Sequence, residues 1–300
     1  MRLKGLVYVI PTLIVISAYG CKREDAESDD EVAIREILAS SPYFSIEDAY
    51  FEGGFVTDST YNSKGDTVLL GWWRSPVSIS RNVWVNIMHD TARAEVNTHI
   101  YGKFRLVYLI LNGSSIDTLK VEKSFHDIVK RYALFTRDGS IDDQNRGWAL
   151  KAVSLAFCET KDLPLGPFFK IDSVRVTYTC DDTPVYSTTF SDFYSLISID
   201  SLLWVGNEGI LTFETWTSPV FSNVFAFFYG ARLWNQLSRV RMRFNDSRFL
   251  IEVNVPHDPL PLVSRFGLSV ISKGSFSFDP NERYMSQGVI IPVLFRSHQD

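Results

Sequence analysis

The chain has 300 residues, 22% of them charged, and a formal net charge of −5. An acidic chain lacks the basic footprint that nucleic-acid binding requires, so we expect no nucleic-acid partner. Apolar residues make up 45% of the chain, which is enough for a globular core, and a chain of this length commonly divides into two domains.

Residues 1–20 have the layout of a secretory signal peptide. Two basic residues precede a short apolar run, and small residues follow it. The run is too short to span a bilayer comfortably, and Pro11 interrupts it. The segment 18–21 resembles the lipobox of bacterial lipoproteins, which implies cleavage after Gly20 and a lipid on Cys21. A plain signal peptide and an uncleaved anchor are the alternatives.

Lipidation of Cys21 would anchor the protein in the membrane of a bacterial cell envelope. Lys22, in the position after the cysteine, fits sorting to the outer membrane if the bacterium has one. Residues 21–30 are charged and nearly free of apolar side chains, which predicts a flexible tether between the lipid and the fold.

Residues 31–160 are predicted to form an α+β domain. Apolar spacing indicates an amphipathic helix over 31–40, and a second short helix is expected over 45–51. Alternation of apolar and polar residues then predicts long antiparallel strands, with a bulge near Asp127–Ile128 where the parity shifts. The expected strands cover residues 83–88, 92–108, 119–136 and 148–157.

The last two of these strands contain Arg131–Phe135 and Arg146–Val153, and together they resemble the closing strands of an NTF2-like domain. The resemblance implies a cone-shaped fold, in which helices pack on a curved antiparallel sheet around a pocket.

Residues 161–167 are predicted to be a linker, because proline and glycine break both periodicities there. Residues 168–300 then show only strand patterns separated by turn signals, which resembles an immunoglobulin-like β-sandwich. The pairing as a whole resembles bacterial lipoproteins in which an NTF2-like domain precedes an Ig-like sandwich, and it implies no particular activity. The strand candidates are 170–178, 201–205, 210–216, 223–229, 237–244, 248–255, 262–271 and 289–295.

His126 and Asp127 are a histidine–carboxylate pair that falls inside a predicted strand, and they are the candidate acid–base residues. Neighbouring residues of a strand point to opposite faces, so the two act together only if a bulge intervenes. A surface or structural role is the alternative.

The loop after residue 136 carries four clustered oxygen donors, the kind of ligand that Ca²⁺ prefers. A solvated hairpin loop explains the same composition without a metal. The candidate ligands are Asp138, Asp142, Asp143 and Asn145.

Arg239, Arg241 and Arg243 alternate with apolar residues, so all three guanidinium groups are expected on one face of one strand. Such a row suits a carboxylate, a phosphate or an acidic glycan. Internal pairing with Asp246 or Glu252 is the alternative.

Cys158 and Cys180 are the cysteines that remain after Cys21, and an exported protein could join them in a disulfide. Two buried thiols are the alternative. No nucleophile-elbow or phosphate-loop motif occurs, and we expect no cofactor. The sequence favours a non-catalytic, lipid-anchored module that binds an envelope protein, a glycan or a small molecule. An enzyme with its site in the N-terminal cone and an adaptor that assembles through sandwich edges are the other hypotheses.

Overall fold

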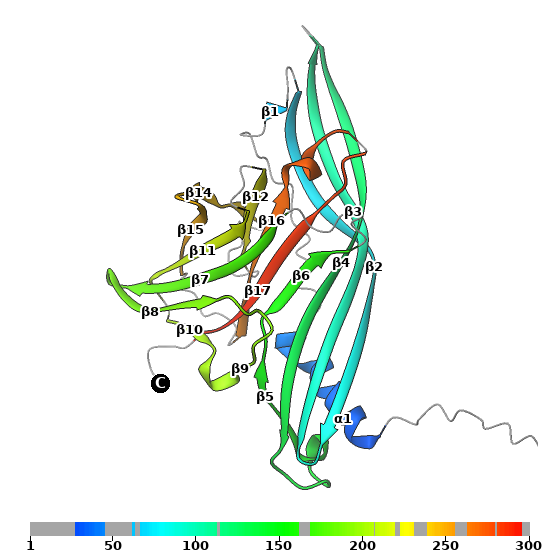
Figure 1. The fold of residues 1–300 in the computed structure, drawn as a ribbon, viewed down its shortest axis with the longest axis vertical. Coiled ribbons are helices and arrows are strands. Elements are labelled where there is room, and N and C mark those ends of the chain that lie inside the picture. Colours follow the sequence, from blue (N-terminus) through cyan, green and yellow to red (C-terminus); the bar gives the residue numbers. More distant parts are fainter. Residues whose placement is uncertain are drawn as a thin grey trace, which may run out of the picture.

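The computed structural model describes residues 28–45, 62–63, 67–112, 115–161, 169–206, 208–219, 223–230, 239–255, 263–279 and 281–295. Within these ranges the chain is almost entirely β, with one α-helix and two stacked sheets (Figure 1). Short 3-10 turns join some of the strands.

Three long strands dominate the main sheet: β2 (Thr67–Met88), β3 (Thr91–Asn112) and β4 (Ser115–Arg137). They stand side by side along the longest axis of the molecule (Figure 1). The predicted turn between the first two is present, and His89 adopts a positive φ of 57° there. Bulges interrupt the β2–β3 register after Leu69 and after Pro76, whereas the β3–β4 register is unbroken.

The main sheet continues from β4 into strands of the C-terminal half. Beyond β4 lie β6 (Ala156–Thr160), β17 (Ser286–Phe295), β16 (Val263–Ser272), β12 (Val224–Tyr229) and β13 (Val240–Arg241). Four short strands extend this sheet. β1 (Asn62–Ser63) pairs with β2, β5 (Trp148–Val153) pairs with β4 and with β9 (Ile197–Ser198), and β10 (Leu203–Val205) pairs with β17. Because β6 pairs with β17, the two halves of the chain share one sheet.

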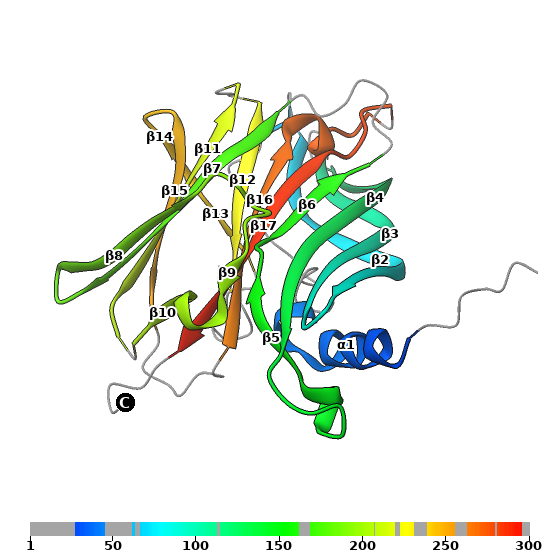
Figure 2. The same cartoon turned by 60° about the horizontal axis from the view of Figure 1, so that its bottom comes forward.

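The second sheet packs on one face of this C-terminal part of the main sheet (Figure 2). Its order is β14 (Arg243–Asn245), β15 (Arg248–Asn254), β11 (Ile210–Ser218), β7 (Lys170–Cys180) and β8 (Thr183–Phe190). The two layers bury aromatic and branched side chains between them, such as Phe213 against Phe228 and Phe266. Alternation along each strand supplies the apolar face that this packing needs.

The main sheet also curls, which brings β2 to face β12 across an interior. Trp72 of β2 lies 4.9 Å from Phe227 of β12 and 5.3 Å from Phe276, measured between ring centroids. Phe276 belongs to the 3-10 turn η4 (Lys273–Phe276). We call the buried space between β2, β4, β12, β16 and β17 the interior of the curl.

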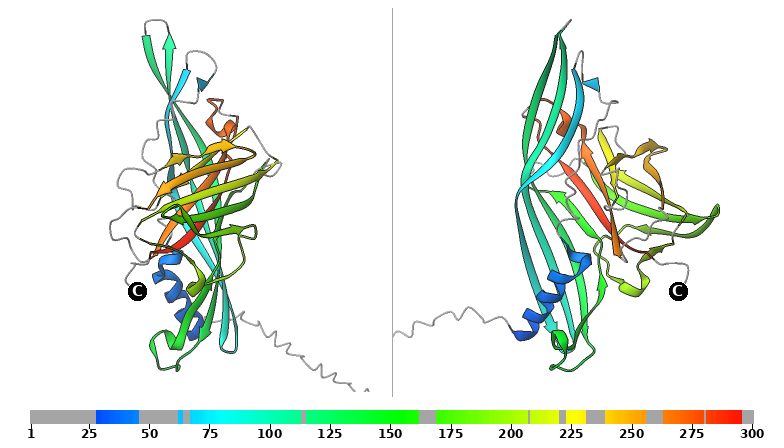
Figure 3. Two further views of the ribbon diagram at one scale, coloured as in Figure 1. Left: turned by 90° about the vertical axis from the view of Figure 1, so that its left-hand side faces the viewer. Right: turned by 180° about the vertical axis from the view of Figure 1, so that it is seen from behind.

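The single α-helix of the described residues is α1 (Asp29–Ser40). It covers the end of the main sheet where β3 begins and β4 ends (Figure 3). Ser28 caps it by accepting a hydrogen bond from the Glu31 amide, so the helix begins two residues earlier than predicted. Ile34 and Leu38 are its buried contacts with the sheet. The 3-10 turns η1 (Pro42–Phe44), η2 (Gln144–Gly147) and η3 (Ile199–Ser201) complete the secondary structure.

The NTF2-like cone and the immunoglobulin-like sandwich predicted for the two halves are both wrong. An NTF2-like domain needs several helices across the concave face of its sheet, whereas here a single helix covers one end of that face and strands and η4 cover the rest. An immunoglobulin-like domain needs two sheets of its own, whereas one layer of this sandwich belongs to the main sheet. The division at residues 161–167 stays a prediction, because 162–168 lie outside the described ranges.

The predicted bulge near Asp127–Ile128 is also absent, because the register of β4 against β3 is continuous there. Ile128 and Val129 are both buried although they point to opposite faces, so the parity shift reflects shielding of both faces of β4. The predicted strand 237–244 is divided, since β13 and β14 belong to different sheets.

The predicted signal peptide, Cys21 and most of the tether lie outside the described residues, as does the second helix after Ser45. In the part of the chain that is described, we find no helix with the length and apolarity required to cross a membrane.

Candidate functional site

A groove of about 690 Å³ opens where the two sheets diverge, and its volume is that of a small-molecule site. Residues from β6, β17, the start of β7, the end of β11 and the β8–β9 loop line it. They are Phe157, Glu159, Phe169, Lys170, Ser191, Asp192, Phe193, Tyr194, Ser218, Pro219 and Gln287. We call this the aromatic groove.

The floor of the aromatic groove is a stack of rings. Phe157 and Phe193 are parallel, with centroids 5.3 Å apart and planes 6° apart. Tyr194 meets the edge of Phe157 at 5.9 Å and that of Tyr132 at 5.5 Å. Both phenylalanines are buried, but Tyr194 is 40% exposed, so its ring is the aromatic surface that a ligand can reach.

The β8–β9 loop positions these rings through a local turn. Asp192 accepts hydrogen bonds from the Tyr194 amide (3.0 Å) and from Ser195 Oγ (2.7 Å). The Ser195 bond, with help from the Tyr194 amide, lowers the pKa of Asp192. An aspartate that bonds the backbone two residues on is a typical turn former, and here it sends Phe193 inward and Tyr194 outward.

Charges of both signs surround this floor. Glu159 accepts a salt bridge from Lys161 (2.8 Å) and a longer one from Lys130 (3.8 Å), while Lys170 is exposed on the opposite side. Burial, followed by Glu159, raises the pKa of the Tyr194 phenol to about 12. The phenol is therefore protonated at neutral pH and can donate a hydrogen bond.

The interior of the curl holds a second, quite different polar cluster. Arg74 is buried and donates from Nε to Tyr284 Oη (2.6 Å), from Nη1 to Tyr229 Oη (3.1 Å) and from Nη2 to Ser269 Oγ (3.0 Å). Tyr284 Oη also lies 2.6 Å from Ser286 Oγ and 3.3 Å from Asp127 Oδ2, and Asp127 is completely buried. The hydroxyl of Tyr284 thus bridges a buried guanidinium and a buried carboxylate.

The surroundings shift the pKa values of the two tyrosines of this cluster, Tyr284 and Tyr229, in opposite directions. Burial raises the pKa of Tyr284 well above its ordinary value. Burial acts in the same sense on Tyr229, but Arg74 and Arg239 outweigh it and lower the pKa of Tyr229. The adjoining cavity measures about 30 Å³, which is room for about one water molecule and none for an organic substrate.

His126 and Asp127 lie on opposite faces of β4, as strand alternation requires. Asp127 points into the interior of the curl, while His126 stacks on Tyr101 with centroids 4.1 Å apart. His126 Nε2 lies 3.0 Å from His99 Nδ1. The structure therefore separates the predicted pair and gives each member a different partner.

The three arginines of the predicted stripe are also separated. Arg239 is buried and stacks on Trp72 at 3.7 Å, and Arg241 is exposed over Phe225 at 4.2 Å. Arg243 is exposed on β14, in the other sheet. Because the chain changes sheet at Met242, these side chains form no row.

The acidic loop folds around its own polar groups. Asp138 pairs with Lys151 and accepts from Thr136 Oγ1 (2.7 Å), and Asp143 accepts from the Ser140 amide (2.7 Å). Among the described residues, Asp138, Asp142, Asp143 and Asn145 do not form a cluster with metal-binding geometry. The next residue, Arg146, holds Asp30 of α1 at 2.8 Å, so the loop fastens the helix.

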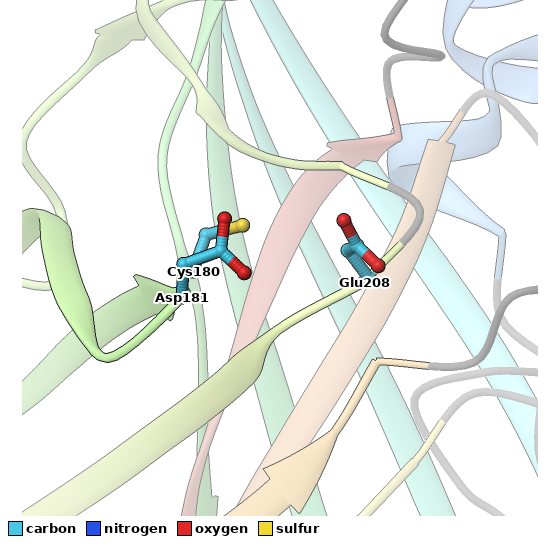
Figure 4. Close-up of side chains that lie close together, drawn as sticks. All are labelled: Cys180, Asp181 and Glu208. Carbon is cyan, nitrogen blue, oxygen red and sulfur yellow. The ribbon is translucent and has the colours of Figure 1, made fainter.

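No disulfide joins Cys158 and Cys180, which lie in different sheets. Cys158 lines the interior cavity, and Cys180 ends β7 beside Asp181 and Glu208. Figure 4 shows the sulfur of Cys180 pointing toward Glu208. The three ligand atoms lie within 4.8 Å of one another, but both carboxylates are exposed on the loops that follow β7 and β10, and nothing else there indicates an ion.

Sequence reasoning missed the aromatic groove, because its floor comes from strands and a loop that are distant in the chain. The sequence around the groove contains only a short turn in which Asp192 precedes two aromatic residues, Phe193 and Tyr194. The groove forms because these two rings pack against Phe157 of β6, which the local sequence does not indicate. No protein-family model, curated protein or solved structure matches this chain.

Proposed function

We propose that this protein is a lipid-anchored component of a bacterial cell envelope that binds a small ligand in the aromatic groove without transforming it. The observation that carries the proposal is a groove of about 690 Å³ with an aromatic floor and a rim of both charge signs. Sites for small ligands combine these two properties: apolar walls supply affinity, and a few polar groups orient the ligand.

Binding is favoured over catalysis because both carboxylates of the groove are already engaged. Glu159 is held by two lysines, and Asp192 is held by its own loop. A general acid or base must present its proton site to the substrate. The buried Asp127 does not meet this need either, since it is completely enclosed and the cavity beside its cluster has room for about one water.

A saccharide is the ligand class that suits this lining best. The apolar face of a sugar ring can stack on the exposed ring of Tyr194, and its hydroxyls can reach Asp192 and Lys170 at the rim. The Tyr194 phenol and the Lys170 ammonium donate, while the carboxylates accept, so both hydrogen-bond roles of a hydroxyl are met.

The test is calorimetric titration of the protein with soluble N-acetylglucosamine oligomers and with neutral glucose oligomers. We expect saturable binding of at least one series, weakened about tenfold or more by Tyr194→Ala, a loss of about 1.4 kcal/mol. Tyr101→Ala is the matched control, because Tyr101 is similarly exposed but lies on β3, outside the groove. Equal affinity in both variants would refute the groove, and no binding of either series would refute the saccharide class.

The anchor is tested separately by replacing Cys21 with Ser and fractionating the cells. We expect the variant to leave the membrane fraction. Membrane association that persists unchanged would contradict lipidation.

A further inference from the structure

The histidine pair on the face of β3 and β4 has a geometry that the aromatic groove does not use. His99 and His126 come from neighbouring strands, and their nearest ring nitrogens are 3.0 Å apart. At that distance one nitrogen must lack a proton, because two N–H groups cannot point at each other. At least one lone pair is therefore directed into the space between the rings.

The two rings are also held in place before any ligand arrives. Tyr101 stacks on His126 with planes 17° apart, and the two imidazoles lie 25° from parallel. The unbroken register of β3 against β4 fixes the distance between the two backbones. Burial, followed by the charges of His126 and Lys161, lowers the pKa of His99.

We propose that His99 and His126 form a two-imidazole site for a divalent transition-metal ion of the Zn²⁺, Cu²⁺ and Ni²⁺ class. Imidazole nitrogens bind these ions at about 2.0–2.1 Å, which in a tetrahedral site places two nitrogens about 3.3 Å apart. The observed separation must widen by a few tenths of an ångström, and the rings must turn so that both lone pairs meet at the ion instead of facing each other. When the metal binds, the imidazole whose proton lies between the rings adopts its other tautomer, and that proton moves through solvent to its second ring nitrogen.

The neighbouring groups set the strength and selectivity of this site. Water fills the remaining coordination positions, because the pair lies on a part-exposed face. Lys161 lies close enough to act on the charge of His99 and opposes a cation, while Glu159 neutralises Lys161 at 2.8 Å. Imidazole ligands select this class of ion over Ca²⁺ and Mg²⁺, which prefer oxygen.

The experiment titrates the full chain with Cu²⁺ in the presence of glycine as a weak competitor, followed by calorimetry and by electron paramagnetic resonance. We expect one tight equivalent whose spectrum shows hyperfine coupling to two imidazole nitrogens. His99→Gln and His126→Gln should each weaken binding by at least the roughly 10- to 100-fold that supporting residues of metal sites are worth. Lys161→Gln should tighten it.

His89→Asn is the matched control, because His89 is an exposed histidine in the β2–β3 turn and asparagine tolerates its positive φ. Its affinity for Cu²⁺ should equal that of the wild type. Thermal unfolding of each variant confirms that the β3–β4 sheet is intact. The proposal is overturned if the full chain binds no Cu²⁺ tightly, or if His99→Gln and His126→Gln bind it as well as His89→Asn does.

Discussion

The interior of the curl and the aromatic groove are both lined by aromatic and charged residues, but the interior is nearly filled whereas the groove is open. In the interior, the Tyr284 hydroxyl contacts both Arg74 and Asp127, and about 30 Å³ is left over. In the groove, charged groups stand at the rim and about 690 Å³ is open. Polar residues that face one another complete a core, whereas polar residues that face a void are available to a ligand.

The largest expected effect tests whether the interior cluster closes the curl. Arg74→Ala would leave Asp127 buried without its bridged cation and would cut the link from β2 to β12 and β16. We expect a loss of about 3–5 kcal/mol in the free energy of unfolding, measured by urea denaturation. The control Arg105→Ala breaks an exposed pair with Glu122 and should cost about 0–1 kcal/mol. Similar losses in the two variants would argue against the closing role.

Removing only the Tyr284 hydroxyl should lower the free energy of unfolding by an intermediate amount. Tyr284→Phe keeps the ring packing against Phe104 and Phe125 but leaves Arg74 and Asp127 without their shared partner. We expect about 1–3 kcal/mol by the same denaturation. If the Phe variant were as stable as the wild type, the hydroxyl would not be the bridge, and water in the cavity would have to replace it.

The pH dependence of the free energy of unfolding tests whether Lys123 of β4 is desolvated in the folded protein. Burial lowers the pKa of Lys123 to about 8 in the folded protein, against an ordinary value of 10.5. The unfolded chain therefore holds this proton more tightly, and stability should rise with pH between about 8 and 10.5. We expect a relative gain of about 1 kcal/mol for the wild type over Lys123→Met across that window. A constant difference between the two proteins would show that Lys123 is not desolvated.

The smallest effect on stability is expected in the groove. Tyr194 is 40% exposed and closes no network, so Tyr194→Ala should change the free energy of unfolding by less than about 1 kcal/mol, even though we expect it to weaken binding of the proposed ligand. Phe193→Ala removes a buried ring and should cost about 3 kcal/mol or more. If Tyr194→Ala lowered the free energy of unfolding as much as Phe193→Ala, Tyr194 would be part of the core, which would argue against the groove as a binding site.

Much of the secondary structure was readable from the sequence. The helix over 31–40, the long hairpin turning at His89 and most of the C-terminal strands are present. Periodicity of apolar residues depends on neighbours along the chain, so it identifies an element wherever one face is buried. It failed where both faces are buried, as at Ile128 and Val129, and where the chain changes sheet, as at Met242.

The candidate site was far less readable. Asp127 was singled out because it follows His126, but its partners are Tyr284 and Ser286, more than 150 residues away. His99 drew no attention because its partner comes from the next strand. The arginine stripe failed because alternation assumes one continuous strand, and Arg241 and Arg243 belong to two.

The sequence by itself determined many of the strands, the turn at His89 and the apolar faces of the long strands, because these depend on local periodicity; it did not indicate β8 or the first half of β2. Tertiary structure alone decided that β6 pairs with β17, that β2 curls over to meet β12 and that Arg74 meets Asp127 through Tyr284. Strand pairing between distant segments is selected by burial and by the satisfaction of polar groups across the whole fold. No local pattern contains that information.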